Sequence, residues 1–122
     1  MVKFSHYAEI DKYVADYDRG AGGRLKESII EIDFETGSFN GVLNFPKTLG
    51  FRDIYSIEYL DMVGSTEQIF YVPAFVRSSS LVYTLNLHGI QGGGASVTSM
   101  RKLSTIGAVL ANGKMYVKVI GV

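Results

Sequence analysis

The residues that can transfer protons or act as nucleophiles are few and far apart in this sequence. It has two histidines, His6 and His88, and no cysteine. General acid–base and nucleophilic catalysis require a titratable side chain placed against a partner that orients it. No Gly-x-Ser-x-Gly elbow occurs, and no acidic residue follows Glu67 to orient an imidazole in the C-terminal half. We therefore predict no catalytic residue and a protein that is not an enzyme.

Cleavage of a glycan requires two carboxylates about 5–9.5 Å apart. The acidic residues in the central part of the chain are Asp53, Glu58, Asp61 and Glu67. An odd number of positions separates Glu58 from Asp61, so the two lie on opposite faces of any strand that they share. A glycan-cleaving β-fold enzyme is therefore the least favoured of three functions considered for this chain.

A calcium loop is matched only in part. Asp16, Asp18 and Glu27 have the spacing of positions 1, 3 and 12 of an EF-hand loop. Gly20 stands at position 5, where a ligand is needed, and Ala21 stands where the loop requires glycine. We expect no metal site.

Phosphate and nucleic-acid sites are also disfavoured. The glycine-rich stretch 92–96 lacks the Lys-Ser or Lys-Thr pair of a phosphate-binding loop, so a loop between two strands is expected there. Arg101 and Lys102 form the one adjacent basic pair after residue 70, and the formal net charge is zero. A nucleic-acid surface needs a denser basic patch than this. We expect no cofactor and no nucleic-acid partner.

The N-terminal segment has helical periodicity. Within residues 6–18, Ile10, Tyr13, Val14 and Tyr17 have the spacing i, i+3, i+4 and i+7, which places them on one face of a helix. We predict a short helix there, followed by a glycine-rich connection. Residues 1–23 are thus expected to form an anchor or packing arm.

From Lys26 onward the period is two, as in strands. Leu81, Tyr83, Leu85 and Leu87 point one way in this pattern, while the residues between them, Val82 to His88, point the other way. Pro73 predicts an edge strand or a bulge, and Asn112-Gly113 predicts a tight hairpin turn. The expected strands are 30–34, 42–45, 54–63, 69–76, 81–88, 95–100, and a closing hairpin of 105–110 and 114–120.

These features predict one fold class. The 14 glycines mark many turns, and the Phe and Tyr content without Trp suits strands. We predict an all-β fold, an antiparallel β-sandwich or jelly roll of about 7–8 short strands with a short N-terminal helix. The sandwich domain is expected to span residues 24–122.

The two ends of the sequence differ in charge. Acidic residues outnumber basic ones in residues 1–35, and only basic ones follow Glu67. Two explanations remain open: attraction between copies of the chain, or scattered surface charges. The N-terminus has no apolar core of a signal peptide, and no apolar stretch reaches the roughly 18–20 residues that span a bilayer. We expect neither secretion nor membrane insertion.

Two segments resemble parts of a known group of proteins. The run from Ile106 to Val122, Ile-Gly-Ala-Val-Leu-Ala-Asn-Gly-Lys-Met-Tyr-Val-Lys-Val-Ile-Gly-Val, resembles the final hairpin of bacteriophage tail-fibre and receptor-binding proteins. The segment Gly41 to Pro46 resembles the opening strand of such β-sandwich tips. The resemblance implies a virion protein made in the host cytoplasm and assembled as a homotrimer. It also implies capsid or tail proteins, or a host surface glycan, as partners.

The resemblance leads to two non-enzymatic functions. The first is a structural protein of the virion that acts as a tail-fibre or receptor-binding module in a homo-oligomer. The alternative is a capsid decoration, or cement, protein whose N-terminal segment reaches onto neighbouring capsid subunits.

Candidate contact residues follow from residue type and expected exposure. Aromatic side chains are enriched at the centres of interfaces, and polar residues around the glycine-rich loop suit contact with a partner or a glycan. The predicted interface residues are Tyr13, Tyr17, Tyr55 and Tyr71, and the predicted partner or glycan contacts are His88, Gln91 and Arg101. Five tyrosines can either form aromatic platforms for sugars or cap the core, which we favour: Tyr55, Tyr59, Tyr71, Tyr83 and Tyr116.

Overall fold

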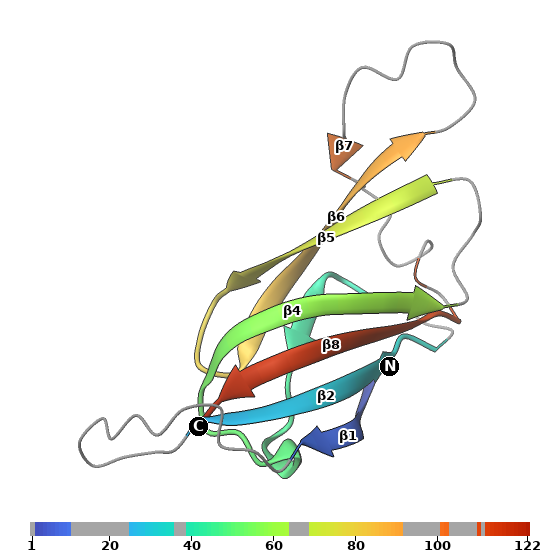
Figure 1. Ribbon diagram of the computed structural model, residues 1–122. Coiled ribbons are helices and arrows are strands. Elements are labelled where there is room, and N and C mark those ends of the chain that lie inside the picture. Colours follow the sequence, from blue (N-terminus) through green and yellow to red (C-terminus); the bar gives the residue numbers. More distant parts are fainter. Residues whose placement is uncertain are drawn as a thin grey trace.

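The computed structural model of the chain is built from strands and one short 3-10 helix (Figure 1). It describes residues 2–10, 25–35, 39–63, 69–91, 101–102, 110 and 112–122, and it describes side chains for all of these except 8–10, 69–71, 89–91 and 101–102. The elements are β1 (Lys3–Ile10), β2 (Lys26–Asp33), β3 (Val42–Asn44), η1 (Lys47–Leu49), β4 (Ile54–Val63), β5 (Ile69–Arg77), β6 (Val82–Gln91), β7 (Arg101–Lys102) and β8 (Lys114–Gly121).

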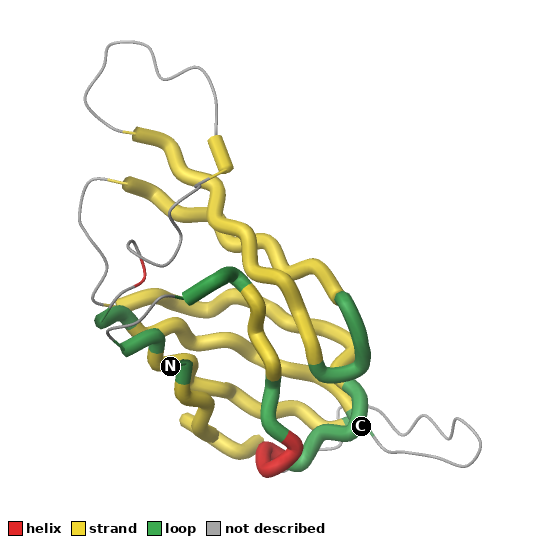
Figure 2. The backbone as a smooth tube through the Cα atoms, turned by 180° about the vertical axis from the view of Figure 1, so that it is seen from behind, coloured by secondary structure: helices red, strands yellow, loops and turns green. Residues whose placement is uncertain are grey.

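The strands form two antiparallel sheets that lie as layers (Figures 1 and 2). The first sheet has the order β1-β2-β8-β4, and the second has the order β3-β6-β5, with β7 pairing onto β6. The prediction of an all-β sandwich is therefore confirmed. Among the described residues, no helix combines the length and the apolar character needed to cross a bilayer.

The core lies between the two sheets and follows the predicted alternation. In β6, Tyr83, Leu85 and Leu87 are buried, and the residues between them are partly exposed, as the sequence pattern requires. β2 and β8 alternate in the same way. The buried apolar side chains are Ile30, Ile32, Phe34, Phe39, Leu43, Phe45, Leu49, Phe51, Ile54, Leu81, Tyr83, Leu85, Leu87, Leu110, Met115, Val117 and Val119.

The predicted N-terminal helix is wrong in its first part. Residues 3–10 form β1, which pairs with β2 from Lys3 opposite Asp33 to Ile10 opposite Glu27. β2 would otherwise be an open edge, and pairing satisfies its backbone groups while Phe4 packs against the core. Tertiary pairing thus overrides a short helical pattern. The rest of the predicted helix lies outside the described residues.

The predicted closing hairpin is also wrong. β8 is a strand, as expected, but it pairs with β2 on one side and with β4 on the other over residues 114–121. No edge of β8 is left for the segment 105–110. A tight turn is present here, but not the predicted one: Asn112 has φ +63°, whereas Gly113 has no positive φ, and the Gly113 N–H donates to the Leu110 carbonyl at 2.9 Å, which closes the turn one residue earlier. This turn leads the chain into the centre of the first sheet. The predicted strand 95–100 lies outside the described residues.

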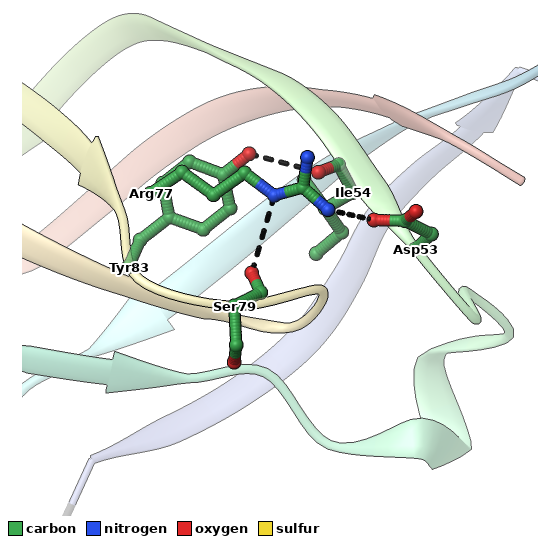
Figure 3. A network of polar contacts seen from close by, with 5 residues as sticks. All are labelled: Asp53, Ile54, Arg77, Ser79 and Tyr83. Atoms are coloured by element: carbon green, nitrogen blue, oxygen red, sulfur yellow. Dashed lines mark hydrogen bonds and ion pairs between the residues drawn. The ribbon is translucent and has the colours of Figure 1, made fainter.

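Polar contacts connect the two sheets at one end (Figure 3). The Tyr83 hydroxyl of β6 donates to the Ile54 carbonyl at the start of β4, at 2.8 Å. The Arg77 guanidinium contacts Asp53 Oδ1 at 2.6 Å and also donates to the Ser79 carbonyl at 3.3 Å. These contacts fix the end of β5 and the start of β6 against the start of β4.

The Tyr83 contact predicts that the free energy of unfolding decreases at alkaline pH. Burial raises the pKa of the Tyr83 phenol above its ordinary value of 10, and nearby Asp53 adds to this rise while Arg77 opposes it. The unfolded chain then loses this proton at lower pH than the folded chain does. The contribution of Tyr83 is complete below about pH 10 and is lost as pH rises through the folded-state pKa.

We expect Tyr83→Phe to lower the free energy of unfolding at pH 7 by about 1–2 kcal/mol, because the Ile54 carbonyl loses a donor. In the same variant, the free energy of unfolding should decrease less steeply with pH above about pH 10. Urea unfolding followed by circular dichroism at pH 7 and pH 10.5 measures both effects. Tyr55→Phe, whose ring is about half exposed, is the control. An equally steep alkaline decline in Tyr83→Phe would contradict the assignment.

Candidate interaction surface

The edges of both sheets carry features that disfavour pairing with another strand. Among the described residues, β1 and β4 bound the first sheet, while β5 on one side and β3 with β7 on the other bound the second. β1 has a bulge at Tyr7, and β4 has bulges at Tyr55 and Leu60. β5 contains Pro73, as the sequence predicted, and β3 is only three residues long. Bulges, proline and short strands all protect an edge.

The outer face of the first sheet is charged, and we call it the charged face. Lys118 of β8 contacts Glu27 of β2 at 2.8 Å and Glu58 of β4 at 3.6 Å. Lys114 contacts Glu31 at 3.4 Å. The hydrogen bond to Glu27, followed by the charges of Glu27 and Glu58, raises the pKa of Lys118. Acidic residues of the N-terminal third thus pair with basic residues near the C-terminus within one chain.

The outer face of the second sheet differs sharply, and we call it the uncharged face. It presents the side chains of β3, β5 and β6 that alternate with the buried ones. Val42, Val72 and Val76 are 44%, 48% and 52% exposed. Among the described side chains of this face, His88 is the one ionisable group, and the register adds Lys102 of β7, which lies opposite His88 at the end of the face. The described members are Val42, Asn44, Val72, Ala74, Val76, Val82, Thr84, Asn86 and His88.

Four predicted contact residues come together at one end of the second sheet. His88 lies on the uncharged face of β6, half-buried, as the alternation predicted. Gly89, the next residue, has Tyr71 of β5 opposite it on one side and Arg101 of β7 on the other. Gln91 ends β6 opposite Ile69. Figure 1 shows this end of the sheet, with β7, extending past the first sheet.

The other predicted interface residues are not part of this group. Tyr55 lies in the first sheet, at a bulge of the edge strand β4. Tyr13 and Tyr17 lie outside the described residues. The structure therefore brings together His88, Gln91, Arg101 and Tyr71 by their backbone positions and leaves Tyr55 apart.

The exposed valines of the uncharged face were missed, although a signal was present. In residues 72–76 the sequence is apolar at every position, so both faces of the strand are apolar. A strand with one solvated face normally alternates with polar residues. Val72, Ala74 and Val76 stand where polar residues are expected. An apolar patch on an exposed face is typical of an interaction surface.

The tyrosines divide between core and surface. Tyr83 is buried, in agreement with the favoured role of capping the core. Tyr116 lies on the charged face, where its ring meets that of Tyr7 at a centroid distance of 4.9 Å and its hydroxyl donates to Glu31 at 3.1 Å. Tyr7 is 65% exposed. Of the aromatic ring contacts among the described residues, this pair lies on an outer face, and Tyr55 is a further exposed aromatic side chain.

His6 forms a Ser–His pair whose geometry indicates a structural link. Its Nε2–H donates to the Leu49 carbonyl at 2.8 Å, because a carbonyl only accepts. Its Nδ1 lies 2.6 Å from the Ser28 Oγ, within hydrogen-bond distance. Ser28 is 4% exposed, so its oxygen is closed to a substrate. The pair holds β1, β2 and η1 together.

A cavity of about 260 Å³ opens between β1 and β3. Its walls include Phe4, Phe39, Asn40 and Asn44, and none of the residues lining it can transfer a proton. In the described part of the chain, no three His, Asp or Glu side chains gather where they could hold a metal ion.

Comparisons with protein-family models, with curated proteins and with solved structures found no match for this chain. The uncharged face of the second sheet is therefore the candidate site on its geometry alone.

Proposed function

We propose that this chain is a non-enzymatic structural protein of a bacteriophage virion that acts as a binding and assembly module in a homo-oligomer. The uncharged face is its contact surface. The observation that carries this proposal is a sheet face with three exposed valines, on which Lys102 of β7, opposite His88 at one end, is the one formally charged position among the described residues. Such a face loses little solvation free energy when a protein surface covers it.

Two other surfaces support the choice of this face. The protected edges disfavour strand addition, and the carboxylates of Glu27, Glu31 and Glu58 are already paired with lysines of the same chain. A partner that paired with them would compete with existing contacts. The virion setting, in a tail fibre or on a capsid, rests on the resemblance of residues 106–122 and 41–46 to tail-fibre and receptor-binding proteins.

Attachment to particles tests the proposal. Val72→Glu/Val76→Glu should abolish incorporation of the chain into purified particles, because two unpaired carboxylates are costly to bury. Val63→Glu is the matched control, since Val63 is equally exposed but lies opposite Lys114 in the first sheet. Immunoblotting of purified particles measures incorporation, and antibody labelling in electron micrographs separates tail tip from capsid face. Absence of the wild-type chain from particles would refute the virion role.

A further inference from the structure

We infer that Asn40 is a site of spontaneous covalent modification in the folded chain, namely deamidation through a cyclic imide. The inference is independent of the proposed function. Of the four asparagines, Asn40 and Asn112 are followed by glycine, whereas Asn44 and Asn86 are followed by larger residues. The imide forms when the backbone nitrogen of the next residue attacks the side-chain carbonyl carbon, and glycine has no Cβ that would crowd this nitrogen. The sequence therefore offers two candidates, and the structure distinguishes them.

The reaction at Asn40 requires only water as a co-reactant. The Gly41 nitrogen bonds to Cγ of Asn40 and gives up its proton, while the bond from Cγ to Nδ2 breaks and ammonia leaves. Water then adds to one of the two imide carbonyl carbons, and the bond from that carbon to nitrogen breaks. The product is aspartate or isoaspartate, depending on which carbon is attacked. Either product carries a carboxylate where the neutral amide stood.

The turn at Asn40 favours the attack. Asn40 Oδ1 accepts a hydrogen bond from the Val42 N–H at 3.0 Å, which makes an Asx turn. Attack on Cγ moves negative charge onto Oδ1, and a backbone N–H at this distance stabilises such a charge. Asn40 is exposed to water, and among the described residues the Gly41 N–H donates to no backbone carbonyl. The attacking nitrogen is therefore not held by a described acceptor.

The turn at Asn112 opposes the same reaction, although Asn112 is exposed too. The Gly113 N–H donates to the Leu110 carbonyl at 2.9 Å, and the Asn112 N–H donates to the Glu35 carbonyl at 2.7 Å. A Cβ atom at Gly113 would lie 3.1 Å from the Leu110 oxygen and 3.3 Å from the Val63 oxygen, so the backbone has little room to turn. The nitrogen that would attack is both hydrogen bonded and tightly packed. We expect this asparagine to react more slowly.

Deamidation changes the border of the uncharged face. Asn40 lines the cavity between β1 and β3 together with Val42 and Asn44, whose side chains belong to that face. The new carboxylate places a negative charge beside this apolar border. In isoaspartate the main chain also gains one carbon atom, which displaces Gly41, whose carbonyl accepts from the Leu85 N–H at 2.8 Å. The modification thus alters both the charge and the backbone next to β3 as the protein ages.

Peptide mapping by mass spectrometry of the full chain, aged in mildly alkaline buffer, tests the inference. Cleavage after lysine and arginine places Asn40 in peptide 27–47 and Asn112 in peptide 103–114. In the folded chain we expect Asn40 to convert at least roughly tenfold faster than Asn112, because a stabilised oxyanion alone is worth that much. In a chain unfolded in urea, where both Asn-Gly pairs lose their surroundings, the two rates should become similar.

Three results would overturn the inference. The first is a folded chain in which Asn112 converts as fast as Asn40 or faster. The second is a folded chain in which neither site converts while both convert in urea, because the turn at Asn40 then protects it. The third is the same preference for Asn40 with and without urea, which assigns the difference to local sequence. Asn40→Gln is the control: peptide 27–47 should then stay unmodified, and continued conversion would move the site to Asn44.

Discussion

Replacing Phe45 with alanine is expected to lower the free energy of unfolding by about 3–5 kcal/mol. Phe45 is 2% exposed and follows β3 directly. Its ring meets Phe4 of β1 at a centroid distance of 4.9 Å and Tyr83 of β6 at 6.3 Å. One side chain thus contacts both sheets, so its loss leaves a cavity that neither layer can fill alone.

Urea unfolding followed by circular dichroism or tyrosine fluorescence measures this effect, since the chain has no tryptophan. Val42→Ala is the control, because Val42 precedes Phe45 by three residues but points to solvent; its change should stay within about 0.5 kcal/mol. Phe45→Leu should fall between the two. A loss below about 1 kcal/mol in Phe45→Ala would mean that Phe45 does not join the sheets.

Replacing Gly121 with alanine should also destabilise the fold, by about 2–3 kcal/mol. A Cβ atom at Gly121 would collide with the Asp53 carbonyl oxygen and would lie 3.0 Å from the Ile54 Cα. Both neighbours are backbone atoms and cannot rotate away. The Asp53 carbonyl also accepts from the Val122 N–H at 2.9 Å, so a shift here disturbs the pairing between the start of β4 and the end of β8.

Gly50→Ala is the matched control for Gly121→Ala. Gly50 has φ +93°, which an alanine adopts only at a cost of about 1–2 kcal/mol, but nothing lies within 4 Å of its Cβ position. Urea unfolding should therefore rank Gly121→Ala as the more destabilising change. Equal losses would indicate that the C-terminal residues separate from β4 at little cost, and that the close approach at Gly121 does not constrain the fold.

The distribution of charge illustrates how a sequence pattern acquires meaning in three dimensions. The acidic N-terminal and basic C-terminal parts left two explanations open, contact between copies or scattered charges. β2 and β8 are neighbours although more than 80 residues separate their starts, and this places Lys118 beside Glu27 and Lys114 beside Glu31. The described pairs lie within one chain, so this attraction helps to hold the first sheet together.

From Lys26 onward, the sequence by itself predicted most of the described strands and which of their faces are buried. The alternation in 81–88 and 30–34 is a local property, because successive side chains of a strand point to opposite faces whatever the partner is. It also determined that Pro73 lies in an edge strand and that Asn112 accepts a positive φ. The polar outward position of His88 followed from the same alternation.

Only the tertiary structure decided which strands are neighbours. Residues 3–10 became a strand because β2 had an open edge, and β8 became a central strand because β2 and β4 both pair with it. Pairing between distant segments depends on the whole set of available edges, which no local window contains. The same pairing placed the valines of β3 and β5 on one face and concentrated the charges on the other. The candidate surface is therefore a product of topology.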